Sequence, residues 1–156
     1  MADADTVVEA TRTASREAAT LRFDALEAGD RLPPFVAAPV TRLQLALFAS
    51  AAADPNPIHV DDAAAQAAGL PGAIVHGMLT MAFLGRLLTR AVPLSAVRAL
   101  DGRFVAMAFP GDTITCTGTI AGKSMEEGER RVAIDLVAQN QRGEPLVTGK
   151  AIVALP

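Results

Sequence analysis

The spacing of the apolar positions along the chain changes once, from helical before about residue 95 to alternating after it. In the helical half, a helix is predicted from Thr41 to about Ala52. Thr41 and Gln44 fit a capping box, and a run of apolar residues follows them. The stretch Asp54-Pro55-Asn56-Pro57 ends this helix, because two prolines in four residues cannot continue it.

Three further elements are predicted in the same half of the chain. A strand is expected at about 35–40, before the first helix. A short Ala-rich helix, capped by Asp61 or Asp62, is expected to stop at Gly69. The longest helix is predicted from Gly77 through Leu88, where the side chains are apolar nearly all round. Such a helix is usually buried, so we expect it to be enclosed on all sides at the centre of the fold.

Polar and apolar positions alternate in the rest of the chain, which predicts strands. The candidate strands cover 103–107, 113–120, 132–138 and 147–155, and turn residues stand between them at 110–112, 126–129 and 140–143. Within 113–120, Thr takes one side and Ile, Cys and Gly take the other. We expect an antiparallel meander with hairpin turns. Helices first and strands afterwards predict an α+β domain whose sheet covers a buried helix.

Length and composition favour one compact unit. A chain of 156 residues is long enough for a single domain, and we expect a flexible leader at 1–20 followed by that domain at 21–156. The leader lacks the apolar stretch of a signal peptide, and nowhere do about 20 apolar residues follow one another without interruption. Cys116 is the single cysteine, so no internal disulfide forms. These features predict a cytoplasmic protein that does not enter a membrane.

Charge excludes several classes of partner. The net charge is −3, and the densest basic run is Arg130-Arg131, with no aromatic residue beside it. Nucleic-acid or anionic-membrane binding is therefore not expected. One cysteine without a histidine cluster also excludes the usual zinc frameworks, so we expect no metal.

Only one segment has the residue types of a reactive site, the loop from Asp54 to His59. Pro55 and Pro57 each fix a backbone dihedral angle, so the loop can hold a carboxylate and an imidazole together with little entropy left to lose. This arrangement would preorganise an acid and a base. The same Asp-Pro-Asn-Pro stretch is also ordinary turn chemistry, and spacing alone leaves both interpretations open.

The loop resembles the signature of the (R)-specific enoyl-CoA hydratases and MaoC-like dehydratases, which read approximately Ser-Gly-Asp-x-Asn-Pro-hydrophobic-His. Asp54, Asn56, Pro57 and His59 match it, and the stretch 74–79, Ile-Val-His-Gly-Met-Leu, resembles the start of the family's helix. The similarity extends from about Leu21 to Leu155, and the chain is most similar to single-hot-dog subunits of (3R)-hydroxyacyl thioester dehydratases. It implies a hot-dog fold, in which a sheet of about five antiparallel strands wraps a long central helix.

The resemblance implies reversible hydration of a trans-2-enoyl thioester, carried on CoA or acyl carrier protein, to the (R)-3-hydroxyacyl thioester. By analogy with the family, His59 takes the proton of water and Asp54 protonates the α-carbon. Asn56 would orient the loop or the substrate. The N–H of Gly77, at the amino end of the central helix, suits the thioester oxygen, because the helix dipole favours negative charge there and no Cβ blocks approach. The reaction needs no metal or redox cofactor.

Four other residues carry expectations. Ala53 stands where the family has Gly, so a bend with positive φ there would be strained by about 1 kcal/mol or more. His76 is expected to be a structural residue that hydrogen-bonds near the helix start. Cys116 alternates with inward-facing residues and is expected to be buried rather than nucleophilic. Arg103 could meet a phosphate of CoA, although an ion pair or a solvated position fits it better.

The predicted sheet has edges, and such edges are commonly covered by a second copy, so we expect a homodimer, with a heterodimer as the alternative. In relatives, the acyl pocket lies between two subunits. Two other functions remain open. One is a hot-dog thioesterase, in which a carboxylate directs water to the thioester carbonyl. The other is a non-catalytic, substrate-binding subunit of a heterodimeric dehydratase.

Overall fold

A five-stranded antiparallel sheet is the main element of the computed structural model, which describes residues 21–156. The strands lie side by side in the order β1-β3-β4-β5-β2. Their bounds are β1 Phe35–Val36, β2 Val97–Phe104, β3 Thr115–Glu126, β4 Glu129–Gln139 and β5 Pro145–Leu155. The flexible leader predicted at 1–20 lies outside the described residues.

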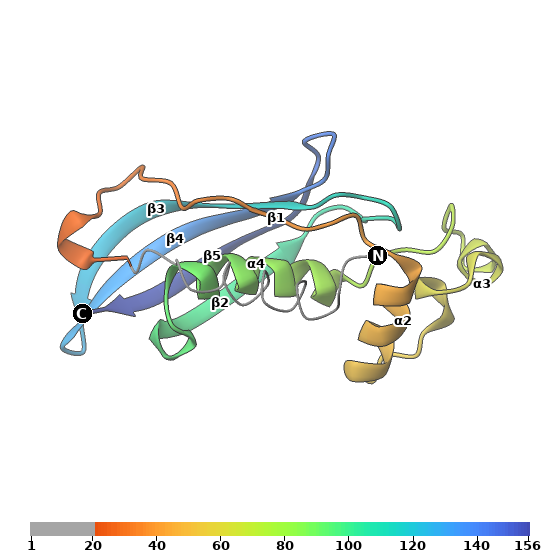
Figure 1. Cartoon of the computed structure of the whole chain (residues 1–156), viewed down its shortest axis with the longest axis horizontal. Coiled ribbons are helices and arrows are strands. Elements are labelled where there is room, and N and C mark those ends of the chain that lie inside the picture. The colour runs from red at the N-terminus through yellow and green to blue at the C-terminus, as the bar shows by residue number, and fades with distance from the viewer. Residues whose placement is uncertain (1–20) are drawn as a thin grey trace, which may run out of the picture.

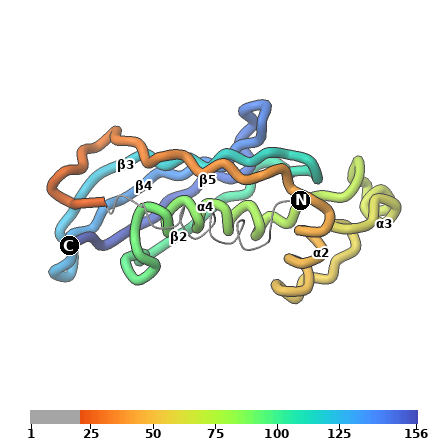
Figure 2. The backbone as a smooth tube through the Cα atoms, in the orientation of Figure 1, coloured from red at the N-terminus to blue at the C-terminus, as the bar shows by residue number. Residues whose placement is uncertain are grey.

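The long helix α4, Gly77–Ala91, lies against one face of the curled sheet, as Figure 1 shows. Two shorter helices, α2 (Arg42–Ala51) and α3 (Asp62–Ala67), gather at the end of the molecule where α4 begins (Figure 2). Three short 3₁₀ turns complete the chain: η1 Phe23–Ala25, η2 Pro57–His59 and η3 Leu94–Ala96. The predicted α+β class, with one helix covered by an antiparallel sheet of five strands, is confirmed.

The core lies between α4 and the sheet. Strand β3 alternates as predicted, with Cys116, Gly118 and Ile120 buried and the threonines between them less so. From the helix, Leu84 and Leu88 are almost fully buried. Each such side chain contributes about 1.5–3 kcal/mol through removal of its apolar surface from water.

The strand predicted at 35–40 is much shorter in the structure, where β1 covers only Phe35–Val36. Pro39 explains the difference, because it has no N–H to donate to the neighbouring strand. The N–H groups of Ala37 and Val40 still donate hydrogen bonds to the carbonyls of Ile114 and Asp112, which precede β3. The segment therefore stays beside β3 without forming a regular ladder.

Only β3, β4 and β5 form the antiparallel meander that was predicted for the second half of the chain. Strand β2 lies at the far edge beside β5, so 110–112 does not close a hairpin between β2 and β3. The run 103–107 is also not a continuous strand, since β2 ends at Phe104. There, Val105 and Ala106 both donate to the carbonyl of Leu146, which breaks the one-to-one pairing of the ladder.

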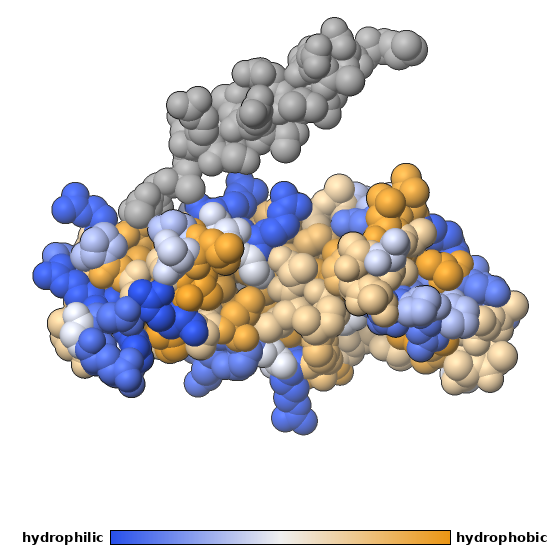
Figure 3. Space-filling model, turned by 90° about the horizontal axis from the view of Figure 1, so that it is seen from below, coloured by the Kyte–Doolittle hydropathy of each residue, from blue (hydrophilic) through white to orange (hydrophobic). Residues whose placement is uncertain are grey.

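Helix α4 is not enclosed on all sides, contrary to the prediction. The sheet covers one face, and Met78, Ala82 and Arg86 on the other are exposed. A single curled sheet reaches only one side of a helix, so the apolar character of the open side has no partner within the described chain. Figure 3, viewed from below, shows apolar surface between charged flanks. Among the described residues, no helix has the length and apolar character needed to cross a membrane.

Candidate active site

The end of α2 fixes the backbone of Asp54. Thr41 caps the start of this helix by accepting a hydrogen bond from the Gln44 N–H, as predicted. At the other end, the Asp54 N–H donates to the Ala49 carbonyl at 2.9 Å, and the Ala53 N–H donates to the Ser50 carbonyl at 3.4 Å. These two bonds form a Schellman motif, in which the residue at the Ala53 position is left-handed. Asp54 is therefore the first residue after a hydrogen-bonded helix cap.

Ala53 has a φ of 52°. The bend before Asp54 therefore has the positive φ at which an alanine was expected to be strained. A left-handed Ala costs roughly 1–2 kcal/mol because its Cβ crowds the following carbonyl. Helix α3 ends in the same motif, with Gly69 at the equivalent position and a φ of 82°. The chain thus contains the same helix cap twice, strained by alanine at Ala53 and relaxed by glycine at Gly69.

Ala53→Gly is expected to raise the free energy of unfolding by up to about 1 kcal/mol, because relief of the left-handed strain exceeds the extra entropy of Gly in the unfolded chain. Urea denaturation followed by circular dichroism measures the change. The matched control is Gly69→Ala, which should lower stability by about the same amount. Equal loss of stability in both variants would show that the bend at Ala53 carries no strain.

Asn56 organises the loop through its side-chain oxygen. The Asn56 N–H donates to Asp54 Oδ1 at 3.4 Å, and Asn56 Oδ1 accepts from the Ile58 N–H at 3.2 Å. The second bond caps η2, which begins at Pro57 and carries His59. Of the two roles expected for Asn56, the structure shows the orientation of the loop.

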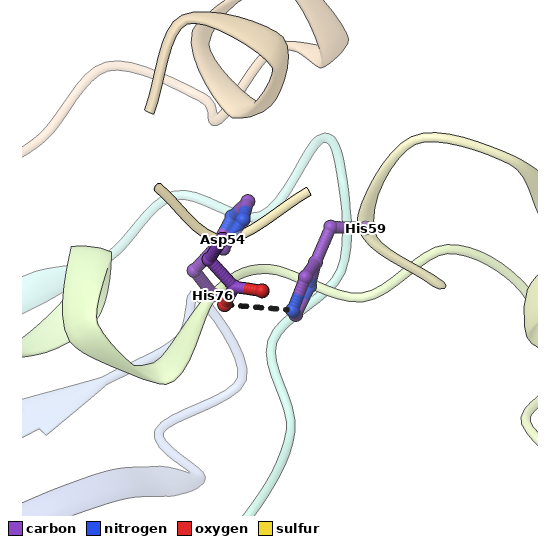
Figure 4. Close-up of side chains that lie close together, drawn as sticks. All are labelled: Asp54, His59 and His76. Carbon is purple, nitrogen blue, oxygen red and sulfur yellow. Dashed lines mark ion pairs between the residues drawn. The ribbon is translucent and has the colours of Figure 1, made fainter. Parts of the chain in front are cut away.

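His59 presents one defined nitrogen to Asp54. Its ring is buried, and Nδ1 lies 2.9 Å from the carbonyl oxygen of Ile74, which can only accept a hydrogen bond. The proton of the neutral ring therefore sits on Nδ1, and the lone pair is on Nε2. Nε2 lies 3.8 Å from Asp54 Oδ2, as the dashed line in Figure 4 shows. This separation exceeds a direct hydrogen bond.

The two groups differ in exposure. The Asp54 side chain keeps 49% of its surface exposed, whereas that of His59 keeps 9%. The carboxylate thus lies toward the outside and the imidazole behind it. A molecule approaching from solvent therefore meets the carboxylate before it reaches the imidazole.

His76 makes no hydrogen bond of normal geometry within residues 21–156, although one was predicted near the helix start. Both ring nitrogens are buried without a partner within residues 21–156, and the side chain does not cap α4. The ring instead stacks on His59, with centroids 3.7 Å apart and planes inclined by 21°. Burial lowers the pKa of His76 below its usual value of 6.5, and the charge of protonated His59 lowers it further. The sequence offers no signal for this contact.

Asp54, His59 and His76 each bring a possible metal-ligand atom within 4.8 Å of the others. Ring nitrogens bind metals through lone pairs in the plane of the ring. Stacked rings keep those lone pairs in two nearly parallel planes rather than aimed at one point, and the Nδ1 of His59 is already occupied. The arrangement thus suits proton transfer better than metal binding.

Gly77 begins α4 directly beside this pair. The carbonyl of His76 accepts hydrogen bonds from Leu79 and Thr80, whereas the Gly77 N–H has no acceptor within the described residues. A Cβ at Gly77 would lie 3.0 Å from the Phe104 ring. The missing side chain therefore lets Phe104 pack over the start of the helix, a contact that sequence reasoning missed.

The remaining candidates lie outside the site. Cys116 is fully buried as predicted, and burial raises the pKa of its thiol to about 12. Arg103 is exposed on the edge strand β2, in the solvated position considered for it. Neither residue takes part in the cluster around His59.

A curled five-stranded antiparallel sheet packed against one long helix is the hot-dog arrangement, which defines the fold class of the protein. Within that class, residues 26–141 match the family described as MaoC like domain, and the chain belongs to this family. The predicted fold and the resemblance to MaoC-like dehydratases are confirmed.

Among curated proteins, the chain is 30% identical over 115 residues to the (R)-specific enoyl-CoA hydratase of Aeromonas caviae, covering 72% of this chain and 84% of that one. A solved structure of the R-hydratase PhaJ1 from Pseudomonas aeruginosa superimposes with a TM-score of 0.76 at 26% identity, covering 87% and 86% of the two chains. The first curated relatives are much longer, and this chain spans less than half of each.

Proposed function

We propose that the protein catalyses the reversible hydration of a trans-2-enoyl thioester, on CoA or acyl carrier protein, to the (R)-3-hydroxyacyl thioester. The observation that carries the proposal is the Nε2 lone pair of His59, which faces Asp54 Oδ2 across 3.8 Å. A water molecule lying to one side of the two atoms can hydrogen-bond to both at about 2.8 Å. The names of the (R)-specific hydratases similar to this chain support the same reaction.

In the proposed hydration, His59 Nε2 takes a proton from water as the oxygen bonds to the β-carbon of the enoyl group. Water addition leaves an enolate, and His59 passes the proton to the carboxylate of Asp54. Asp54 gives that proton to the α-carbon, so the double bond becomes a single bond and both groups are restored. Dehydration follows the same steps in reverse.

Negative charge builds on the thioester oxygen while water adds. The Gly77 N–H lies at the positive end of the α4 dipole and has no acceptor within the described chain. We assign it as the donor to that oxygen. One such donor contributes about 2.7–4 kcal/mol to transition-state stabilisation in enzymes where it has been removed.

The proposed reaction is tested with purified protein and crotonyl-CoA, by following the loss of enoyl absorbance. Turnover without release of CoA supports the hydratase. Release of free CoA with an intact double bond would instead identify a thioesterase. No turnover by the chain alone, restored by a second protein, would identify a substrate-binding subunit of a heterodimer.

We also propose that two copies form a homodimer through the face that β2 and α4 leave open. β2 is an eight-residue edge strand with most of its side chains exposed. Apolar side chains are exposed beside it and around the start of α4, namely Leu47 (63%), Met78 (60%), Phe104 (50%), Val105 (46%) and Met107 (46%). An unpaired edge next to clustered apolar surface favours association.

Light scattering after gel filtration is expected to give twice the 16.1 kDa of one chain. Val105→Glu should shift the protein to the monomer mass, because a charge would be buried at the interface. The control is Met125→Glu, which alters an exposed apolar residue near the β3–β4 turn and should leave the dimer intact. A monomer in the unsubstituted protein would refute the proposed dimer.

Two further proposals concern the whole chain. The described segment 21–156 forms one domain, because a single core of buried residues joins α2, α4 and the sheet. The protein acts in the cytoplasm, since its one cysteine is buried and free in the manner of proteins from reducing compartments.

A further inference from the structure

His76 is the one described residue with buried side-chain nitrogens that lack a hydrogen-bond partner. Only 2% of the residue is exposed, and each nitrogen is closed off from solvent. Buried polar atoms are nearly always satisfied, so an exception calls for an explanation. The same burial means that His76 does not contact the substrate directly.

The position of the ring suggests its role. His76 contacts two aromatic side chains: the Phe48 ring is tilted against it with centroids 5.0 Å apart, and the His59 ring is stacked on it with centroids 3.7 Å apart. Figure 4 shows the histidine side chains gathered beside Asp54. His59 is therefore held twice, through its face by His76 and through Nδ1 by the Ile74 carbonyl. Together these contacts fix the direction in which Nε2 points.

The charge of His76 also matters to His59. The titratable groups facing His76 are Asp54 and His59, and its neighbour from α2, Phe48, carries no charge. Burial keeps the His76 pKa low, so the ring stays neutral while His59 gains and loses a proton. A neutral ring can lie on an imidazolium without charge repulsion, and the face of an aromatic ring attracts a cation.

We propose that His76 is a positioning residue that holds the plane of His59 and leaves the single positive charge of the stacked pair to His59. This inference rests on the proposed hydratase function, because it assigns His76 a part in the proton transfer by His59.

The kinetic test compares His76→Ala, which removes the stacked ring, with His76→Phe, which keeps an aromatic face. His76→Ala should lower kcat at least tenfold with KM changed less than threefold, and His76→Phe should retain at least a third of kcat. Phe48→Leu is the matched control, because it removes the other aromatic neighbour of His76 but not the contact with His59. It should change kcat less than twofold.

A spectroscopic test works even if His76→Ala does not fold. The chain has only two histidines, so ¹⁵N resonances of the imidazoles in the untagged protein report on His59 and His76 alone. We expect His59 to be protonated on Nδ1 when neutral, and His76 to be mostly neutral at pH 6.5. The Nδ1 form of His59 should persist in His76→Phe.

The outcomes separate the two proposals. An unsubstituted protein without hydratase turnover overturns the proposed function, whatever the spectra show. An active protein in which His76→Ala matches the unsubstituted kcat overturns the positioning role, as does His76→Phe falling to the level of His76→Ala. A His76 ring that is charged at pH 6.5 overturns it as well.

Discussion

Asp54→Asn and His59→Ala are each expected to lower kcat for crotonyl-CoA hydration a hundredfold or more. Asparagine keeps the size of Asp54 but cannot carry the proton for the α-carbon, and alanine removes the Nε2 that accepts a proton from water. General acid–base groups typically contribute a factor of 10²–10⁴. Because both serve one proton circuit, the double variant should be little slower than the slower single variant. Initial rates of enoyl absorbance loss measure all three.

A matched control separates this effect from a general loss of negative charge in the loop. Asp61→Asn makes the same chemical change a few residues away, at the cap of α3, where Asp61 Oδ1 accepts from the Ala63 N–H. Asparagine caps helices as well as aspartate, so kcat should change less than threefold. Retained activity in either Asp54→Asn or His59→Ala would refute the assigned roles.

Gly149→Ala is expected to lower the free energy of unfolding by about 3 kcal/mol, the upper range for overpacked sites. Gly149 lies in β5 opposite Gly102 of the edge strand β2. A Cβ at Gly149 would run into the backbone carbonyl oxygen of Asp101, which cannot swing away as a flexible side chain would. The substitution therefore forces β2 away from β5. Urea denaturation measures the loss.

Gly122→Ala provides the comparison, because Gly122 is also a strand glycine but has nothing within 4 Å of a Cβ built on it. Stability should be unchanged or raised by up to about 1 kcal/mol, since alanine loses less backbone entropy on folding. Similar losses in the two variants would mean that the close approach of β2 to β5 does not limit this position.

Local patterns could predict much of this fold. Thr41 and the two prolines after Asp54 mark where α2 begins and ends, and both effects act within a few residues. The alternation in β3 follows from which side of a strand faces the core. The convergence of Asp54 and His59 was predictable for the same reason, because the stiff loop between them is short.

Long-range arrangements could not be predicted this way. Nothing near β2 in the sequence indicates that it pairs with β5 rather than β3, since the pairing joins segments about fifty residues apart. The partner of His59 Nδ1 is the backbone carbonyl of Ile74, and every residue has such a group. The stacking of His76 on His59 depends on the same tertiary contact. The sequence predicts that the open side of α4 is buried, because an apolar side chain does not show whether its own chain or another chain would cover it.

The cap at Ala53 links the acid of the site to a helix that has only one buried side chain. Leu45 is the only buried residue of α2, and the motif that places Asp54 closes that helix with a strained alanine. Such a segment can open locally while the core stays folded. His59, which is stacked on His76 and hydrogen-bonded to Ile74, would then remain in place while Asp54 moves away. Heating should therefore abolish the proposed hydratase activity at a lower temperature than it unfolds the sheet, and the activity should return on cooling as α2 refolds.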